Sequence, residues 1–138
     1  MGILGLSYKP DTEVIEESQG MMLAALLADA GYRVVVYDPA AMENARRVLD
    51  SRVEYAESME ACAQRAATLV IATPWKPFQS LRPQHLRQSN PRPAIFDWWR
   101  ILPPGVFEPA TRYLACGRGP SMTEKGQLAY AEGVASSR

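Results

Sequence analysis

Two cations, Lys9 and Arg100, are the residues of this 138-residue chain whose types and places could do chemistry. Lys9 follows Tyr8 shortly after the apolar run 3–6, and Arg100 comes directly after two tryptophans. An ammonium and a planar guanidinium together suit a diphosphate, and an aromatic ring offers a face for stacking. The plainer alternatives are a solvated Lys9 with Tyr8 packed on its own domain, and an Arg100 paired with an acidic residue of the stretch 11–17.

Aromatic residues flank these cations at two further places. In the segment 73–78, two prolines fix the chain around Trp75, which we expect to be a packing anchor together with Phe78, or else to line a cleft. The pair Trp98-Trp99 is costly to expose, so it predicts the lining of a pocket, a domain interface or a dimer interface.

The positions of these residues depend on alternating strands and helices. Apolar runs of strand length occur at 3–6, 33–38, 52–56, 68–74, 93–97 and 112–117, with helix-like stretches at 19–31, 40–49 and 57–66. We expect Ser18 and Gly31 to cap the first helix. The alternation predicts an α/β fold, a Rossmann-like doubly wound parallel sheet of about six strands with helices on both faces. In the strand order 3-2-1-4-5-6, the loops after strands one, four and five meet, which brings Lys9 and Arg100 to one cleft.

Composition excludes several classes of protein. Lys plus Arg and Asp plus Glu both number 15, so the chain lacks the basic excess of proteins that bind nucleic acid through its phosphates. It has neither a membrane-spanning apolar run nor a signal peptide, and the two cysteines, Cys62 and Cys116, fit no disulfide framework or zinc site. We therefore expect a cytoplasmic protein without nucleic-acid or membrane partners, with both cysteines as small core residues.

A dinucleotide fingerprint is absent from the first turn. Gly2 and Gly5 are present, but bulky residues including Leu6 and Lys9 occupy the places of the remaining Gly-x-Gly-x-x-Gly pattern. Asp38 stands where such domains carry a ribose-binding acid, yet without the glycines it is predicted to cap the turn that follows it. We expect no cofactor, no metal and no catalytic residue in this chain.

Four segments together resemble a known family. GLSYKPDTEVIEESQG, YDPAAMENA, TPWKPF and FDWWR occur in the order found in the C-terminal domain of the UDP-glucose/GDP-mannose dehydrogenase family, over about residues 2–119. The resemblance implies a UDP-sugar-binding domain whose Tyr8, Lys9 and Arg100 meet the nucleotide sugar. It also implies that the full-length enzyme oxidises a UDP-sugar to the uronate with NAD, which an N-terminal domain binds.

Departures from the family pattern limit what this chain does alone. Glu16 stands where the family often has an arginine that faces the interdomain cleft, and Gln19 where it usually has proline. The family's catalytic cysteine, NAD-binding domain and central helix have no counterpart here, so we expect an isolated, non-catalytic domain. Residues 1–118 form the predicted binding domain, and 119–138 a mobile tail. An interaction module that has lost ligand binding is the alternative function, and a homodimer stays open.

Overall fold

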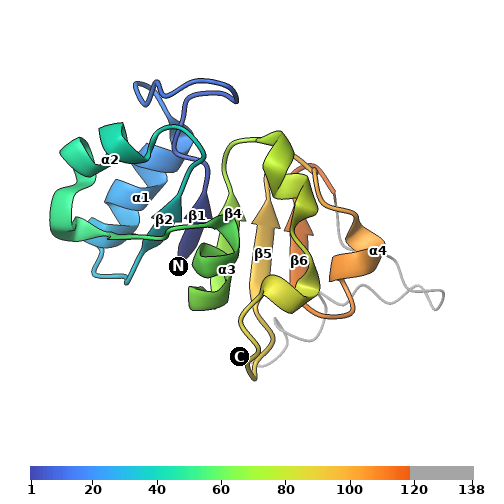
Figure 1. Ribbon diagram of the computed structural model, residues 1–138. Coiled ribbons are helices and arrows are strands. Elements are labelled where there is room, and N and C mark those ends of the chain that lie inside the picture. Colours follow the sequence, from blue (N-terminus) through green and yellow to red (C-terminus); the bar gives the residue numbers. More distant parts are fainter. Residues whose placement is uncertain (119–138) are drawn as a thin grey trace, which may run out of the picture.

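The computed structural model describes residues 1–118, which form one six-stranded sheet (Figure 1). All strand pairs are parallel, in the order β3-β2-β1-β4-β5-β6. This is the predicted α/β, Rossmann-like sheet with the predicted strand order. The strands are β1 (Gly2–Leu4), β2 (Val35–Tyr37), β3 (Glu54–Tyr55), β4 (Thr68–Ile71), β5 (Ala94–Asp97) and β6 (Arg112–Ala115).

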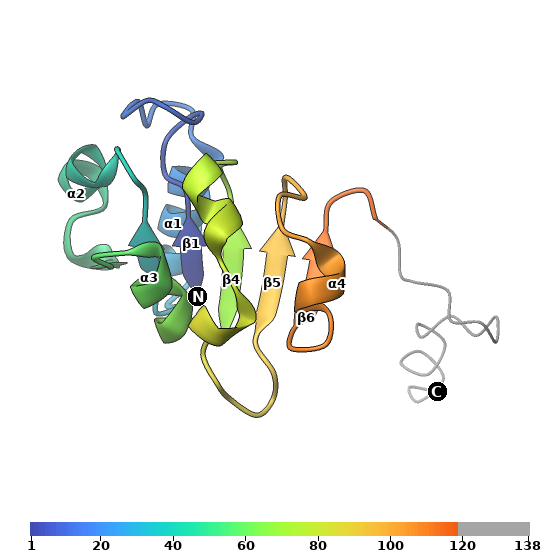
Figure 2. The ribbon, with the colours of Figure 1, turned by 45° about the vertical axis from the view of Figure 1, so that its right-hand side comes forward.

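Helices cover both faces of the sheet (Figure 2). One face carries α1 (Gln19–Asp29) and α2 (Met42–Leu49). The other carries α3 (Met59–Arg65), α4 (Pro104–Phe107) and the 3₁₀ turn η2 (Lys76–Ser80). Two further 3₁₀ turns, η1 (Asp50–Arg52) and η3 (Pro83–His85), complete the elements.

Each central strand contributes to two separate cores. In β1, Ile3 packs on the α1 side and Leu4 on the α3 side, and the neighbouring Val36 and Val35 of β2 divide in the same way. All four side chains are buried. A strand covered on both faces needs apolar residues at consecutive positions, which explains the continuous run Val34–Val36.

On the α1 side, the helical cover ends between β4 and β5. Val70 of β4 is buried, whereas its register neighbours Phe96 of β5 and Leu114 of β6 are 39% and 46% exposed. Within residues 1–118, no helix packs over these two side chains. Helices therefore lie on both faces of the sheet, as predicted, and on the α1 side they leave β5 and β6 uncovered within residues 1–118.

The ends of α1 follow the predicted signals. The Ser18 hydroxyl accepts a hydrogen bond from the Met21 N–H at 3.2 Å, and so caps the first turn. Gly31 lies one residue beyond the C-terminal cap, Ala30, with φ of +83°, a conformation that favours glycine.

Several boundaries and short elements differ from the sequence prediction. β1 and β4 end at Leu4 and Ile71, earlier than expected. The short elements η2 and α4 had no helical periodicity to reveal them. The predicted tail, 119–138, lies outside the described residues. No helix in residues 1–118 combines the length and apolar character needed to cross a membrane.

A glycine pair sets the distance between α1 and the sheet. A Cβ atom on Gly20 would lie 2.0 Å from the Gly5 carbonyl oxygen, so α1 and the residue that follows β1 touch through their backbones. A Cβ on Gly5, whose φ is +102°, would lie 2.5 Å from Thr73 Cβ in the loop after β4. Only glycine permits this approach at both positions.

We predict that Gly20→Ala destabilises the domain by about 1–3 kcal/mol, because the methyl group must displace backbone rather than a mobile side chain. Urea unfolding measures the loss. Gly105→Ala is the matched control, since a Cβ there meets no atom within 4 Å. Equal stability of both variants would contradict the close contact.

Candidate functional site

The loops that follow β1, β4 and β5 meet at one edge of the sheet. These three strands are neighbours and run in the same direction, so their carboxyl ends lie side by side (Figure 1). This edge is where open parallel sheets bind ligands. It carries the predicted site residues on the loop 5–18 after β1 and the segment 98–103 after β5.

The buried Asp38 carboxylate holds the edge together from the end of β2. Its Oδ2 accepts hydrogen bonds from the backbone N–H groups of Leu6 at 2.7 Å and Ser7 at 2.9 Å. The Ser7 hydroxyl and the Trp75 indole N–H also donate to it, at 2.9 and 3.2 Å. One oxygen therefore ties the loop after β1 to the loop after β4.

The second oxygen of Asp38 caps its own turn. Oδ1 accepts from the N–H groups of Ala40 and Ala41, both at 2.8 Å. This confirms the predicted capping role. The contacts of Oδ2 were not predicted, because they join residues more than 30 positions apart.

Trp75 packs as an anchor. Its side chain is buried, and its indole N–H donates to Ser7 Oγ at 2.8 Å as well as to Asp38. Phe78 is fully buried on the same face of the sheet, as the packing interpretation requires. The structure thus places the Trp75 ring in the interior and corrects its alternative assignment as a cleft-lining residue.

A second buried carboxylate, Asp97, organises the loop after β5. Its Oδ1 accepts from the Trp99 N–H at 3.2 Å, and its Oδ2 accepts from the Leu102 N–H at 2.9 Å. The Tyr113 hydroxyl also donates to Oδ2, at 2.8 Å. Burial and this hydrogen bond raise the pKa of Tyr113 well above its usual range, so the phenol keeps its proton.

Arg100 stands between the two backbone groups that Asp97 holds. Its φ is +55°, a left-handed conformation that is uncommon for a residue with a side chain. The neighbouring Trp99 donates its indole N–H to the Ala72 carbonyl at 2.9 Å, while its side chain stays 55% exposed. The loop is therefore fixed at its backbone and at Trp99, and the guanidinium side chain is exposed.

Tyr8, Lys9 and Arg100 are all exposed at this edge. The Tyr8 side chain is 60% exposed, so it does not pack on its own domain. No ion pair within residues 1–118 involves Lys9 or Arg100, which removes the predicted alternative of an Arg100 salt bridge to the acidic loop. Their convergence on one ligand stays a prediction.

The loop after β1 folds back over its own start. The Tyr8 N–H donates to the Val14 carbonyl at 2.7 Å, and the Asn44 side chain of α2 donates to the Glu13 carbonyl at 2.9 Å. Glu16 follows on this loop and is exposed, just before the Ser18 cap of α1.

Metal and thiol chemistry find little support in the described part. No group of three potential ligands gathers within residues 1–118. Cys62 is fully buried, as predicted, and burial raises its pKa to about 12. Cys116 is exposed, so its assignment as a core residue was wrong. It follows the edge strand β6 into a turn, where nothing in residues 1–118 covers it.

The comparisons with known proteins agree with this geometry. Residues 2–104 match the model of the UDP-glucose/GDP-mannose dehydrogenase family, UDP binding domain. The chain belongs to this family. The match runs from β1 to the first residue of α4 and contains all the motifs on which the resemblance was based.

Relatives of this UDP binding domain are much longer proteins. The chain is 34% identical over 119 residues to UDP-glucose 6-dehydrogenase of Rhizobium meliloti, which covers 86% of this chain and 27% of that protein. Among solved structures, a UDP-glucose dehydrogenase from Pyrobaculum islandicum is 32% identical, with a TM-score of 0.65 over 82% of this chain and 24% of the other. A UDP-D-ManNAc dehydrogenase from Pyrococcus horikoshii, 23% identical with a TM-score of 0.63 over 85% of this chain and 25% of the other, shares the fold. The UDP binding domain thus spans about a quarter of the length of these relatives.

Sequence reasoning missed that Asp38 and Asp97 position the two loops. A signal was available in the sequence. Asp38 and Asp97 are the last residues of the apolar runs 33–38 and 93–97, and the chain turns after each of them. Such an aspartate accepts backbone N–H groups as the chain leaves the sheet.

We predict that Asp38→Asn destabilises the UDP binding domain by about 2–3 kcal/mol, because the amide cannot accept from all the donors around Oδ2. Thermal or urea unfolding measures the effect. Asp29→Asn, which alters an exposed ion pair with Arg52, serves as the control and should change stability by less than about 0.5 kcal/mol. A smaller loss at Asp38 than at Asp29 would refute the role assigned to the carboxylate.

The two thiols should differ sharply in reactivity. With a thiol reagent at neutral pH, we expect one rapid reaction, at Cys116, and reaction of Cys62 only on unfolding. Mass spectrometry of peptides locates the label, and Cys116→Ser is the control. Rapid labelling of Cys62 in the folded chain would contradict its burial.

Proposed function

We propose that this domain binds the UDP part of a UDP-sugar within an NAD-dependent nucleotide-sugar dehydrogenase, and that it does not catalyse the oxidation alone. The family match carries the proposal. It is supported by the names of relatives that are UDP-glucose 6-dehydrogenases and by exposed cations at the carboxyl edge of the sheet. UDP-glucose is the first candidate substrate.

Lys9, Arg100 and Tyr8 are the proposed contacts of the nucleotide sugar. The ammonium of Lys9 and the guanidinium of Arg100 would neutralise the diphosphate, and the Tyr8 ring would pack against the ligand. Their exposure and the lack of competing ion pairs within residues 1–118 support these roles. Asp97 supports them indirectly because it fixes the backbone on both sides of Arg100.

Trp99 and Glu16 are the proposed cleft-lining residues. Trp99 combines an exposed ring with an indole N–H anchored on Ala72, so it offers a rigid apolar wall. Glu16 would face the remainder of the enzyme from the start of α1, and its negative charge would distinguish this chain from relatives that carry arginine there.

We assign NAD to the N-terminal domain of the full-length enzyme rather than to this chain. In a dinucleotide-binding domain, the backbone N–H groups after the first strand face the pyrophosphate. Here the corresponding N–H groups of Leu6 and Ser7 donate to Asp38. The Cβ position of Gly5 is already in contact with Thr73. The residues of this turn therefore do not fit a bound pyrophosphate.

The proposed partners are the UDP-sugar and the NAD-binding domain, in a cytoplasmic enzyme. A cytoplasmic setting agrees with the two free thiols, one of them exposed.

One observation favours the alternative, an interaction module. Phe96 and Leu114 lie side by side on β5 and β6 with their side chains exposed. Such an exposed apolar pair, with the exposed Trp99 in the segment that follows β5, suits a domain or dimer interface. In this alternative the module has lost ligand binding, so it would not bind nucleotides.

Isothermal titration of the 138-residue chain with UDP, UDP-glucose, GDP-mannose and NAD tests the proposal. We expect UDP compounds to bind and NAD not to bind. Lys9→Ala and Arg100→Ala should each weaken UDP binding about tenfold, since each removes a charge-assisted contact to phosphate.

Arg47→Ala is the matched control, because it removes an exposed arginine from α2 and should leave UDP affinity unchanged. Loss of binding in the control, or undiminished UDP affinity in the Lys9 and Arg100 variants, would refute the assigned site. Sedimentation of Phe96→Ser against the parent chain tests the alternative, which requires self-association that the variant loses.

A further inference from the structure

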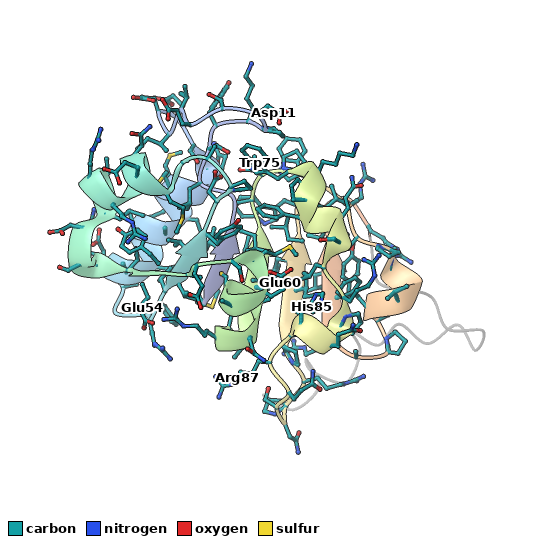
Figure 3. All side chains as sticks on the ribbon, in the orientation of Figure 1. Asp11, Glu54, Glu60, Trp75, His85 and Arg87 are labelled. Atoms are coloured by element: carbon teal, nitrogen blue, oxygen red, sulfur yellow. The ribbon has the colours of Figure 1, made fainter. Side chains whose placement is uncertain are left out.

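Two adjoining cavities lie at the opposite end of the sheet from the candidate site. The larger, about 570 Å³, and the smaller, about 280 Å³, share Arg87, Ser89 and Arg92 in their linings. These residues belong to the connection between η3 and β5, at the amino ends of the strands. In Figure 3, Arg87 lies at one end of the molecule, and Asp11 and Trp75 lie at the other.

The charged residues that line these cavities are all arginines. Arg87 and Arg92 line both cavities, Arg112 of β6 lines the smaller one, and neither lining includes an aspartate or glutamate. The sequence 61–96 contains five Lys and Arg residues and no acidic residue, although the whole chain is neutral. No ion pair in the described chain involves these three arginines. Their mutual repulsion would be relieved by a bound anion.

Arg92 is held in place across the cavities. Its Nη1 donates to the Pro109 carbonyl at 2.8 Å, which links the connection before β5 to the turn before β6. A guanidinium that is hydrogen-bonded through one nitrogen still offers N–H groups on its other nitrogens. Because the side chain is already held, it loses less conformational entropy when a ligand binds. Thr68 and Asn90 add neutral polar groups to the smaller cavity.

The larger cavity has an apolar wall beside the arginines. Pro83, Leu86, Pro93 and Ala110 form it, and Leu86 and Pro93 are themselves buried. A cavity of this size suits a small molecule. A ligand that fits both features has a strongly anionic group and a compact apolar or aromatic body.

From this arrangement we infer a second ligand site, separate from the proposed UDP site, for a small phosphate-bearing anion. The phosphate group binds between Arg87 and Arg92, with Arg112 on the side of the smaller cavity. The body of the ligand packs on Pro83, Leu86, Pro93 and Ala110. Phosphate is preferred to chloride because it pairs with guanidinium in a bidentate manner, and to acetate because it carries more negative charge and more acceptor oxygens for several arginines.

Nuclear magnetic resonance titration of the ¹⁵N-labelled 138-residue chain tests this site, with inorganic pyrophosphate and adenosine monophosphate as probes. We expect saturable shifts at the backbone N–H groups of residues 87–90 and 92. The double variant Arg87→Gln/Arg92→Gln should weaken binding about tenfold or more. Arg47→Gln removes one exposed positive charge elsewhere and should leave the affinity unchanged. Lys9→Gln should leave the affinity read from the shifts of residues 87–92 unchanged, which separates this site from the proposed UDP site.

The outcomes discriminate between the sources of the phosphate. If adenosine monophosphate binds more tightly than pyrophosphate, the ligand is a nucleotide whose base packs on the apolar wall. If the two bind equally, the site recognises the phosphate group alone. Both results support the site. Shifts confined to residues 5–12 and 97–100, an equal loss in Arg47→Gln, or no saturation at about 10 mM probe would overturn it. If the double variant unfolds, Arg112→Gln replaces it, and unchanged pyrophosphate affinity in that variant would count against the inference.

Discussion

The carboxyl edge of this domain depends on one buried charge, the Asp38 carboxylate. It accepts hydrogen bonds from four backbone N–H groups, one hydroxyl and one indole. The desolvation of a carboxylate is costly, and this set of charge-assisted hydrogen bonds offsets it. Because the donors come from the ends of β1 and β2 and from the loop after β4, three loops are held in one arrangement by a single side chain.

Asp97 has the corresponding role on the other side of β4. Both aspartates are fully enclosed and saturated by donors, whereas Lys9 and Arg100 are exposed on the loops that these aspartates hold. Two buried carboxylates thus position these loops, while Lys9 and Arg100 are exposed at the edge together with the acidic residues of the stretch 11–17.

The sheet order and the faces of the central strands were predictable because continuous apolar runs and alternating helices permit few parallel topologies. The Ser18 cap and the turn at Gly31 follow from local chemistry of the same kind. The short turns η2 and α4 were not predictable, since four or five residues carry no periodicity and proline-rich loops fold against the core that surrounds them.

The candidate site was only partly predictable. The exposed cations were visible in the sequence as side chains after apolar runs, and so was the anchoring role of Trp75 beside Phe78. The long-range bonds of Asp38 and Asp97 were not visible, because they depend on which loops become neighbours in space. The exposure of Cys116 was missed for a similar reason: β6 is an edge strand, and position in the sheet decides what covers it.

The backbone contact between Gly5 and Gly20 has a consequence for how this domain tolerates change. It fixes the two ends of the loop after β1 against each other, independently of what the loop contains. The exposed residues in between can then be exchanged, in sign as well as in size, without moving the helix or the strand. The charge at Glu16 can thereby change without altering the framework that carries Lys9.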